Sequence, residues 1–82
     1  MYYVYGAKDS RATNRAEFIL YTTKTPYRLF LLNKDYTIKQ LGSLIPNVKT
    51  VPQVFKQSIH IGGLKELYDE LYSDYKGELL WN

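Results

Sequence analysis

Thr50-Val51-Pro52-Gln53-Val54-Phe55, followed shortly by His60-Ile61-Gly62-Gly63, is the stretch of this 82-residue sequence that decides the fold. Its apolar and β-branched residues predict two short strands, 53–56 and 58–61, separated by Gln57. The glycine pair marks the start of a final helix. Apolar residues recur there with helical spacing, at Leu64, Leu67, Tyr68 and Leu71. A hairpin followed by a helix is therefore expected in the second half of the chain.

The first half predicts a strand and then a helix. Residues 2–5 are aromatic or β-branched and are closed by Gly6, as in a short strand. Asp9 or Ser10 can cap the following helix, because a short side-chain oxygen accepts a hydrogen bond from an early helical N–H. The helix is expected to run to about Thr22. Its apolar stripe consists of Ala12, Ala16, Ile19 and Leu20.

The middle of the chain predicts a second strand and a second helix. Residues 27–32 are nearly continuously apolar, which is typical of a central parallel strand. A short helix over 37–44 ends before Pro46, because proline cannot continue a helix. The order is then β-α-β-α-β-β-α, which places the chain in the α/β class.

Length and composition favour one domain spanning residues 1–82. With 45% hydrophobic residues, a chain this short can build one small core. Residues 73–82 are expected to form a C-terminal tail. Its residues Leu79, Leu80 and Trp81 either pack back on the domain or serve a partner.

Charge and cysteine content exclude several classes of function. The net charge is +3, but the basic residues are scattered along the sequence, so no nucleic-acid interface is expected. The chain has no cysteine, which excludes disulfides, thiolate metal ligands and thiol mechanisms. The carboxylates between Glu66 and Glu78 read as a solvated face, and no metal site is expected. No apolar run approaches a membrane span or a secretion signal, and a cytoplasmic protein without membrane contact is expected.

Several blocks together resemble glutaredoxins over about residues 2–72. They are Tyr3-Val4-Tyr5-Gly6 with Lys8, Arg15-Ala16, Asn47 to Phe55, and His60-Ile61-Gly62-Gly63 with Leu67. The short form is similar to the glutaredoxins of large bacteriophages. The resemblance implies a thioredoxin fold, with a four-stranded mixed sheet flanked by helices. It also implies that Pro52 is a cis-proline beside the position of the catalytic thiol.

The thiol half of the glutaredoxin site is missing. By resemblance, Ser10-Arg11-Ala12-Thr13 occupies the place of the Cys-x-x-Cys motif, with Ser10 at the nucleophile and Thr13 at the resolving position. Thiol exchange needs a thiolate at the helix N-terminus, and a serine hydroxyl stays protonated at neutral pH. The sequence as it stands therefore predicts no redox catalysis.

The binding half of that site is better preserved. The resemblance implies that the backbone of Val51 pairs with an extended ligand and that Gly62 and Gly63 approach the γ-glutamyl carboxylate of glutathione. It also implies that Lys8 reaches the glycine carboxylate. However, Lys65 stands near the position of a family aspartate and would repel the ligand amine. Weak or no glutathione binding is expected, and no other cofactor.

These observations predict a redox-inactive binding module whose groove consists of Lys8, Ser10, Arg11, Thr13, Val51, Pro52, Gly62 and Gly63. The cations Lys8 and Arg11 favour an acidic or extended segment of a partner protein, with the chain a monomer or weak oligomer. One alternative is a monothiol oxidoreductase whose nucleophilic cysteine has been replaced by Ser10. Another is an assembly role for the aromatic C-terminal stripe. A structural interpretation also stands, in which Ser10 and Thr13 cap a helix and Pro52 serves the fold.

Overall fold

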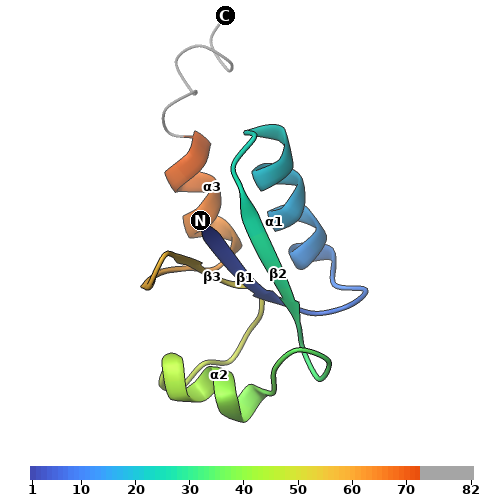
Figure 1. The fold of residues 1–82 in the computed structure, drawn as a ribbon, viewed down its shortest axis with the longest axis vertical. Coiled ribbons are helices and arrows are strands. Elements are labelled where there is room, and N and C mark those ends of the chain that lie inside the picture. Colours follow the sequence, from blue (N-terminus) through green and yellow to red (C-terminus); the bar gives the residue numbers. More distant parts are fainter. Residues whose placement is uncertain (73–82) are drawn as a thin grey trace, which may run out of the picture.

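The computed structural model describes residues 1–72. The predicted tail 73–82, with Leu79, Leu80 and Trp81, lies outside the described residues. Seven elements follow one another: β1 (Tyr2–Gly6), α1 (Arg11–Thr22), β2 (Tyr27–Leu31), α2 (Ile38–Leu44), β3 (Gln53–Lys56), β4 (Ile59–Gly62) and α3 (Leu64–Tyr72). This is the predicted β-α-β-α-β-β-α order (Figure 1).

The four strands form one mixed sheet in the order β2-β1-β3-β4. β1 runs parallel to β2, while β3 is antiparallel to both β1 and β4. The prediction that β2 is a central strand is wrong: it lies at the edge of the sheet, and its apolar run reflects contacts on both faces. β4 also begins one residue later than predicted, because the turn takes two residues, with Gln57 at a φ of 56°.

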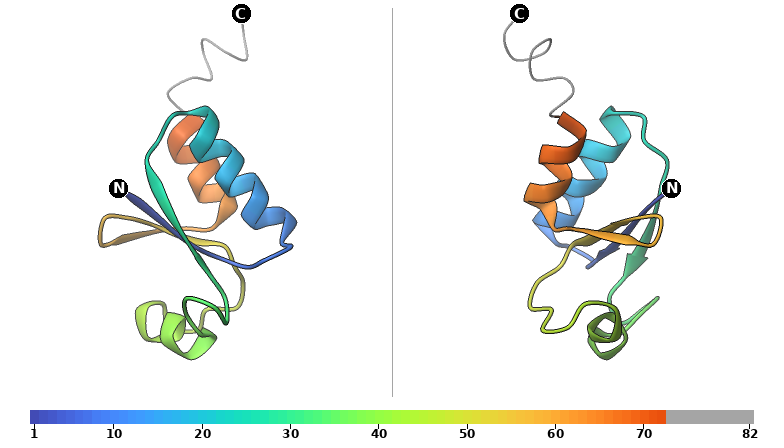
Figure 2. Two further views of the ribbon diagram at one scale, coloured as in Figure 1. Left: turned by 45° about the vertical axis from the view of Figure 1, so that its right-hand side comes forward. Right: turned by 90° about the vertical axis from the view of Figure 1, so that its left-hand side faces the viewer.

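The two longer helices cover one face of the sheet, and α2 lies on the other side (Figures 1 and 2). Between the sheet and the helices α1 and α3 lies the core. Its buried members are Tyr2, Val4, Ala16, Ile19, Leu20, Val54 and Leu67. Of the predicted stripe of α1, Ala16, Ile19 and Leu20 are buried as the 3.6-residue periodicity predicted, whereas Ala12 is only half-buried and Thr13 is buried in the first turn instead.

The opposite sheet face is only partly covered by α2. Leu41 is 1% exposed, and the buried Tyr36 hydroxyl donates a hydrogen bond to the Gly6 carbonyl at 2.8 Å. One turn away, Leu44 is 54% exposed. The helix thus seals one end of this face and leaves the rest accessible.

Candidate functional site

The predicted site residues gather where β1 ends and where α1, β3 and α3 begin. In the register of the sheet, Tyr5 at the end of β1 pairs with Gln53 at the start of β3. Pro52 therefore enters the sheet beside Gly6, from which the chain leads to α1. A Cβ atom added to Gly63 would lie 3.3 Å from the Pro52 carbonyl oxygen. The fold thus brings the proline segment, the glycine pair and the start of α1 to one end of the sheet, here called the proline site.

Ser10 is the N-cap of α1. Its Oγ accepts a hydrogen bond from the Thr13 N–H at 3.1 Å, and its carbonyl accepts one from the Asn14 N–H at 3.0 Å. A hydroxyl at an N-cap satisfies a backbone donor that the helix itself leaves unpaired. Ser10 therefore has the structural role that the sequence allowed as its alternative.

Thr13 lies inside the molecule, with 1% of its surface exposed. Its Oγ1 accepts a hydrogen bond from the Ala7 N–H at 3.0 Å, just after β1. A Cβ atom on Gly6 would lie only 2.5 Å from Thr13 Cγ2, so this strand end has room for glycine alone. Thr13 joins the first turn of α1 to the end of β1, which makes it a packing residue rather than one open to a ligand.

The segment before β3 offers an extended stretch of backbone. The Val51–Pro52 peptide bond is cis, Pro52 is buried and Val51 is half-buried. Within residues 1–72, neither the N–H nor the carbonyl of Val51 takes part in a hydrogen bond. These two groups are therefore available to pair with an extended peptide in the manner of an added strand.

A carboxylate of the chain itself occupies the start of α3. The Gly63 N–H donates a hydrogen bond to Glu66 Oε1 at 2.8 Å, and this bond is the main reason why the pKa of the Glu66 carboxyl is lowered. Gly62 has a φ of 125°, and a Cβ atom there would lie 2.6 Å from Glu66 Cγ. Glu66 thus folds over the glycine pair, where the resemblance places the ligand carboxylate.

Sequence reasoning assigned Glu66 to a solvated face and missed this contact. The available signal was the three-residue spacing from Gly63, because a Glu at the third helical position reaches back to the N-cap N–H. His60 is exposed, and its Nε2 lies 2.8 Å from Gln53 Oε1 on the surface of the sheet.

The charges at the proline site nearly cancel. Lys8 and Arg11 are exposed and form no ion pair or hydrogen bond within the described residues. Asp9 is exposed between them, and the Glu66 carboxylate lies on the α3 side. The electropositive rim expected from Lys8 and Arg11 is therefore opposed by two carboxylates.

Across residues 1–72, no group of three or more His, Cys, Asp or Glu residues is placed to hold a metal ion. Within the same residues, no helix is long and apolar enough to cross a membrane.

Comparison with known proteins gives a match of structure only. No protein-family model and no curated protein sequence matches the chain. Glutaredoxin 1 from Francisella tularensis, solved with cacodylate, is 17% identical and has a TM-score of 0.66, covering 99% of this chain and 96% of its own. Holo glutaredoxin C1 from Populus tremula x tremuloides is 21% identical with a TM-score of 0.71, covering 96% and 78%. This chain has the thioredoxin fold.

Ure2p, solved in complex with glutathione, is a further structural neighbour of this thioredoxin-fold chain. It is 15% identical, with a TM-score of 0.72 over 95% of this chain. This chain spans about a third of Ure2p, since the match covers 34% of that protein. The fold expected from the resemblance to glutaredoxins is thereby confirmed.

Proposed function

We propose that this chain is a glutaredoxin-like binding module that lacks redox activity and captures an extended segment of a partner protein at the proline site. The availability of the Val51 N–H and carbonyl carries this proposal. A peptide laid against Val51 would gain two backbone hydrogen bonds, as when a strand is added to a sheet. The chain has no cysteine, so no thiol exchange can accompany binding.

Glutathione is a poorer candidate ligand for the proline site than a peptide. Ure2p was solved with glutathione, which makes the tripeptide the natural comparison. In this chain, the Gly63 N–H that would meet its γ-glutamyl carboxylate is bonded to Glu66 instead. Lys65 follows two residues after Gly63, near where the resemblance to glutaredoxins places the ligand amine, although its Nζ is paired with Asp69 at 3.0 Å. We therefore propose that the protein needs no glutathione or other cofactor. We also propose that it acts in the cytoplasm, as a monomer or weak oligomer.

Two cations set the charge preference of the proposed site. Lys8 and Arg11 border the start of α1, whose N-terminus also favours an anion. An acidic segment would gain from these groups but would have to approach Asp9 and Glu66 as well. The proposal therefore predicts that acidic peptides bind somewhat more tightly than basic ones, while backbone hydrogen bonds to Val51 contribute to the affinity of both.

The test uses a capped hexapeptide of alternating Glu and Val residues, which favours an extended conformation, and a matched peptide of alternating Lys and Val residues. We expect Arg11→Glu to weaken binding of the acidic peptide by about threefold to tenfold, as for an exposed charge reversed near a ligand. Lys24→Glu is the control, because Lys24 is exposed in the turn beyond the far end of α1. Equal affinities for wild type and Arg11→Glu would place the binding surface elsewhere.

A further inference from the structure

The sheet face turned away from α1 and α3 carries a cluster of aromatic rings. Tyr3 and Tyr5 of β1 alternate with the core residues of that strand, and Phe30 and Phe55 stand beside them on β2 and β3. The Tyr5 ring centroid lies 5.2 Å from that of Phe30 and 5.7 Å from that of Phe55. Strand alternation thus places one set of apolar residues in the core and a second set on this outer face.

Two adjoining hollows lie between these rings and α2. The first, of about 310 Å³, is lined by the four rings, by Leu44 and by the turn at Gln57 and Ser58. The second, of about 330 Å³, shares Tyr5, Phe30 and Leu44 and continues along α2 toward Gln40. Together they are called the aromatic groove. Each is at the lower end of the volume range of ligand pockets. The first is lined mainly by apolar side chains, whereas the second mixes apolar residues with the polar side chains of Asp35, Tyr36 and Gln40.

The chain segment that frames this groove is strongly basic. From β2 to the end of β4, residues 27–62 carry five cations and one carboxylate, a net charge of +4 against +3 for the whole chain. The acidic residues lie mostly before and after this segment. Lys56 belongs to the other face, where its Nζ lies 4.0 Å from Glu70 Oε2 of α3. The other four cations are Arg28, Lys34, Lys39 and Lys49.

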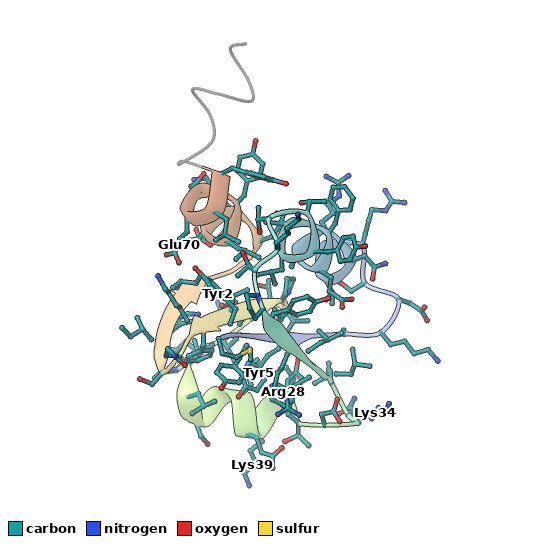
Figure 3. All side chains as sticks on the ribbon, turned by 45° about the horizontal axis from the view of Figure 1, so that its top comes forward. Tyr2, Tyr5, Arg28, Lys34, Lys39 and Glu70 are labelled. Carbon is teal, nitrogen blue, oxygen red and sulfur yellow. The ribbon has the colours of Figure 1, made fainter. Side chains whose placement is uncertain are left out.

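Three of these cations, Arg28, Lys34 and Lys39, lie on the α2 side of the molecule. Arg28 pairs in register with Tyr3, so the two side chains share a face of the sheet. Figure 3 shows Arg28 and Tyr5 on the side of the sheet opposite Tyr2, with Lys34 on the adjoining loop and Lys39 on α2. The one carboxylate of the segment, Asp35, lines the second hollow and accepts a hydrogen bond from the Leu31 N–H at 2.8 Å, and the three cations on this side outnumber it. The sequence pattern concealed this concentration, because the cations are spread along the chain and only the fold assembles them.

We propose that the aromatic groove binds an acidic segment of a partner protein that inserts two large apolar side chains. Two adjoining hollows fit two anchors about one helical turn apart, a spacing of roughly 5–6 Å in a helix. Aspartate and glutamate residues beside the anchors would pair with Arg28, Lys34 and Lys39. This surface lies across the sheet from α1 and α3 and does not depend on the proline site.

The packing of the rings favours a peptide over a single-stranded nucleic acid. Base stacking needs exposed ring faces. Here Tyr5 packs edge to face against Tyr36, at an interplanar angle of 87°, and against Phe55, at 72°. Tyr3 and Phe30 are nearly parallel, at an interplanar angle of 15°, but they stack on each other. The rings around Tyr5 therefore present edges and crevices, which suit aliphatic or aromatic side chains. Leu44 forms an aliphatic wall between the two hollows and adds to this preference.

The test begins with fluorescence anisotropy on the full chain. The probe is a labelled 12-residue glutamate-rich peptide with Trp and Leu four positions apart, and its control has Lys in place of each Glu. We expect the acidic peptide to bind at least about tenfold more tightly. Equal affinity for the two peptides, or no saturation by roughly 1 mM, would overturn the proposal. Tighter binding of a 12-nucleotide oligothymidylate would also overturn it, in favour of nucleic acid.

Two pairs of variants locate the binding surface. Leu44→Glu places a charge in the groove and should weaken the acidic peptide about tenfold, whereas Ile59→Glu, at a 68% exposed residue on the other face, should not. Arg28→Glu should weaken it about threefold to tenfold, and Lys24→Glu should leave it unchanged. Arg11→Glu should also have no effect, which separates this proposal from the proline site. If Ile59→Glu matched Leu44→Glu, or Arg11→Glu matched Arg28→Glu, the groove would not be the binding surface.

Discussion

Thr13 shows how a residue predicted for a catalytic position serves the fold instead. Its hydroxyl oxygen accepts the Ala7 N–H, and the side chain is almost fully buried. Thr13→Val keeps the shape but leaves that N–H without a partner, which costs about 1–3 kcal/mol. We expect this loss in the free energy of urea unfolding. The control Thr22→Val, at an exposed residue of the same helix, should change it by less, and equal losses would contradict the role given to Thr13.

Glu66 is the residue that we expect to compete with an anionic ligand at the proline site. Its carboxylate accepts the Gly63 N–H and covers Gly62. Glu66→Ala frees this donor and removes a negative charge, so the glutamate-valine hexapeptide should bind about threefold more tightly. Glu17→Ala removes an equal charge from α1, where the Glu17 carboxylate accepts a hydrogen bond from the Tyr27 hydroxyl at the other end of the sheet, and serves as the control. A weaker affinity in Glu66→Ala would show that Glu66 instead helps to form the site.

At the scale of single elements, α2 offers the clearest test. Thr37 and Gln40 form a capping box at its start, but Gly42 lies in its interior, where glycine weakens a helix. Nothing lies within 4 Å of a Cβ atom added to Gly42. Gly42→Ala should therefore stabilise the protein by about 0.5–1 kcal/mol in urea unfolding.

Gly6→Ala is the matched opposite of that change. Its Cβ atom would collide with Thr13, so we expect a destabilisation of about 1–3 kcal/mol. A loss of stability in Gly42→Ala would mean that the space beside α2 is filled in solution.

The sequence predicted the elements well because each carries a local signal. Ser10 and Thr37 cap helices, Pro46 lies beyond α2, and the Gly62-Gly63 pair precedes α3. The position of β2 in the sheet could not be read in this way. Strand order depends on pairing between distant segments, and the apolar run that suggested a central strand fits an edge strand equally well.

Candidate functional residues were harder to predict than elements. The sequence indicated which residues meet at the proline site, because they belong to the blocks that resemble glutaredoxins. It did not show that the Glu66 carboxylate accepts a hydrogen bond from the Gly63 N–H, or that Thr13 is buried. Both features depend on side-chain conformation. The aromatic groove escaped prediction because its rings and cations come from β1, β2, β3 and α2 and meet only after folding.

At the scale of the whole molecule, two tyrosines tie the helices to the sheet. The Tyr2 hydroxyl of β1 donates to Glu70 of α3, and the Tyr27 hydroxyl of β2 donates to Glu17 of α1. Burial first, and then the hydrogen bond to each carboxylate, raises the pKa of both tyrosines to about 12. Each folded-state pKa lies above the ordinary value of 10.0, so this stabilisation is full below pH 10 and is lost as the pH rises toward 12.

We therefore expect the urea midpoint to fall between about pH 10 and pH 12. The fall should be smaller in a Tyr2→Phe/Tyr27→Phe double variant, which has already lost both hydroxyls. Tyr21→Phe removes a hydroxyl from a residue that is 78% exposed and should follow the wild type. Identical pH profiles for the wild type and the double variant would contradict this account.

The proposed function requires that this chain, which lacks the catalytic cysteine of glutaredoxins, binds an extended peptide beside Pro52. The most direct measurement is an amide-resolved NMR titration of the full chain with the glutamate-valine hexapeptide. We predict that the largest shift arises at Val51, whose N–H and carbonyl would pair with the peptide, with smaller shifts at Gly63 and near Arg11. Saturable binding that leaves Val51 unmoved, or no shifts at all at peptide concentrations well above roughly 1 mM, would contradict it.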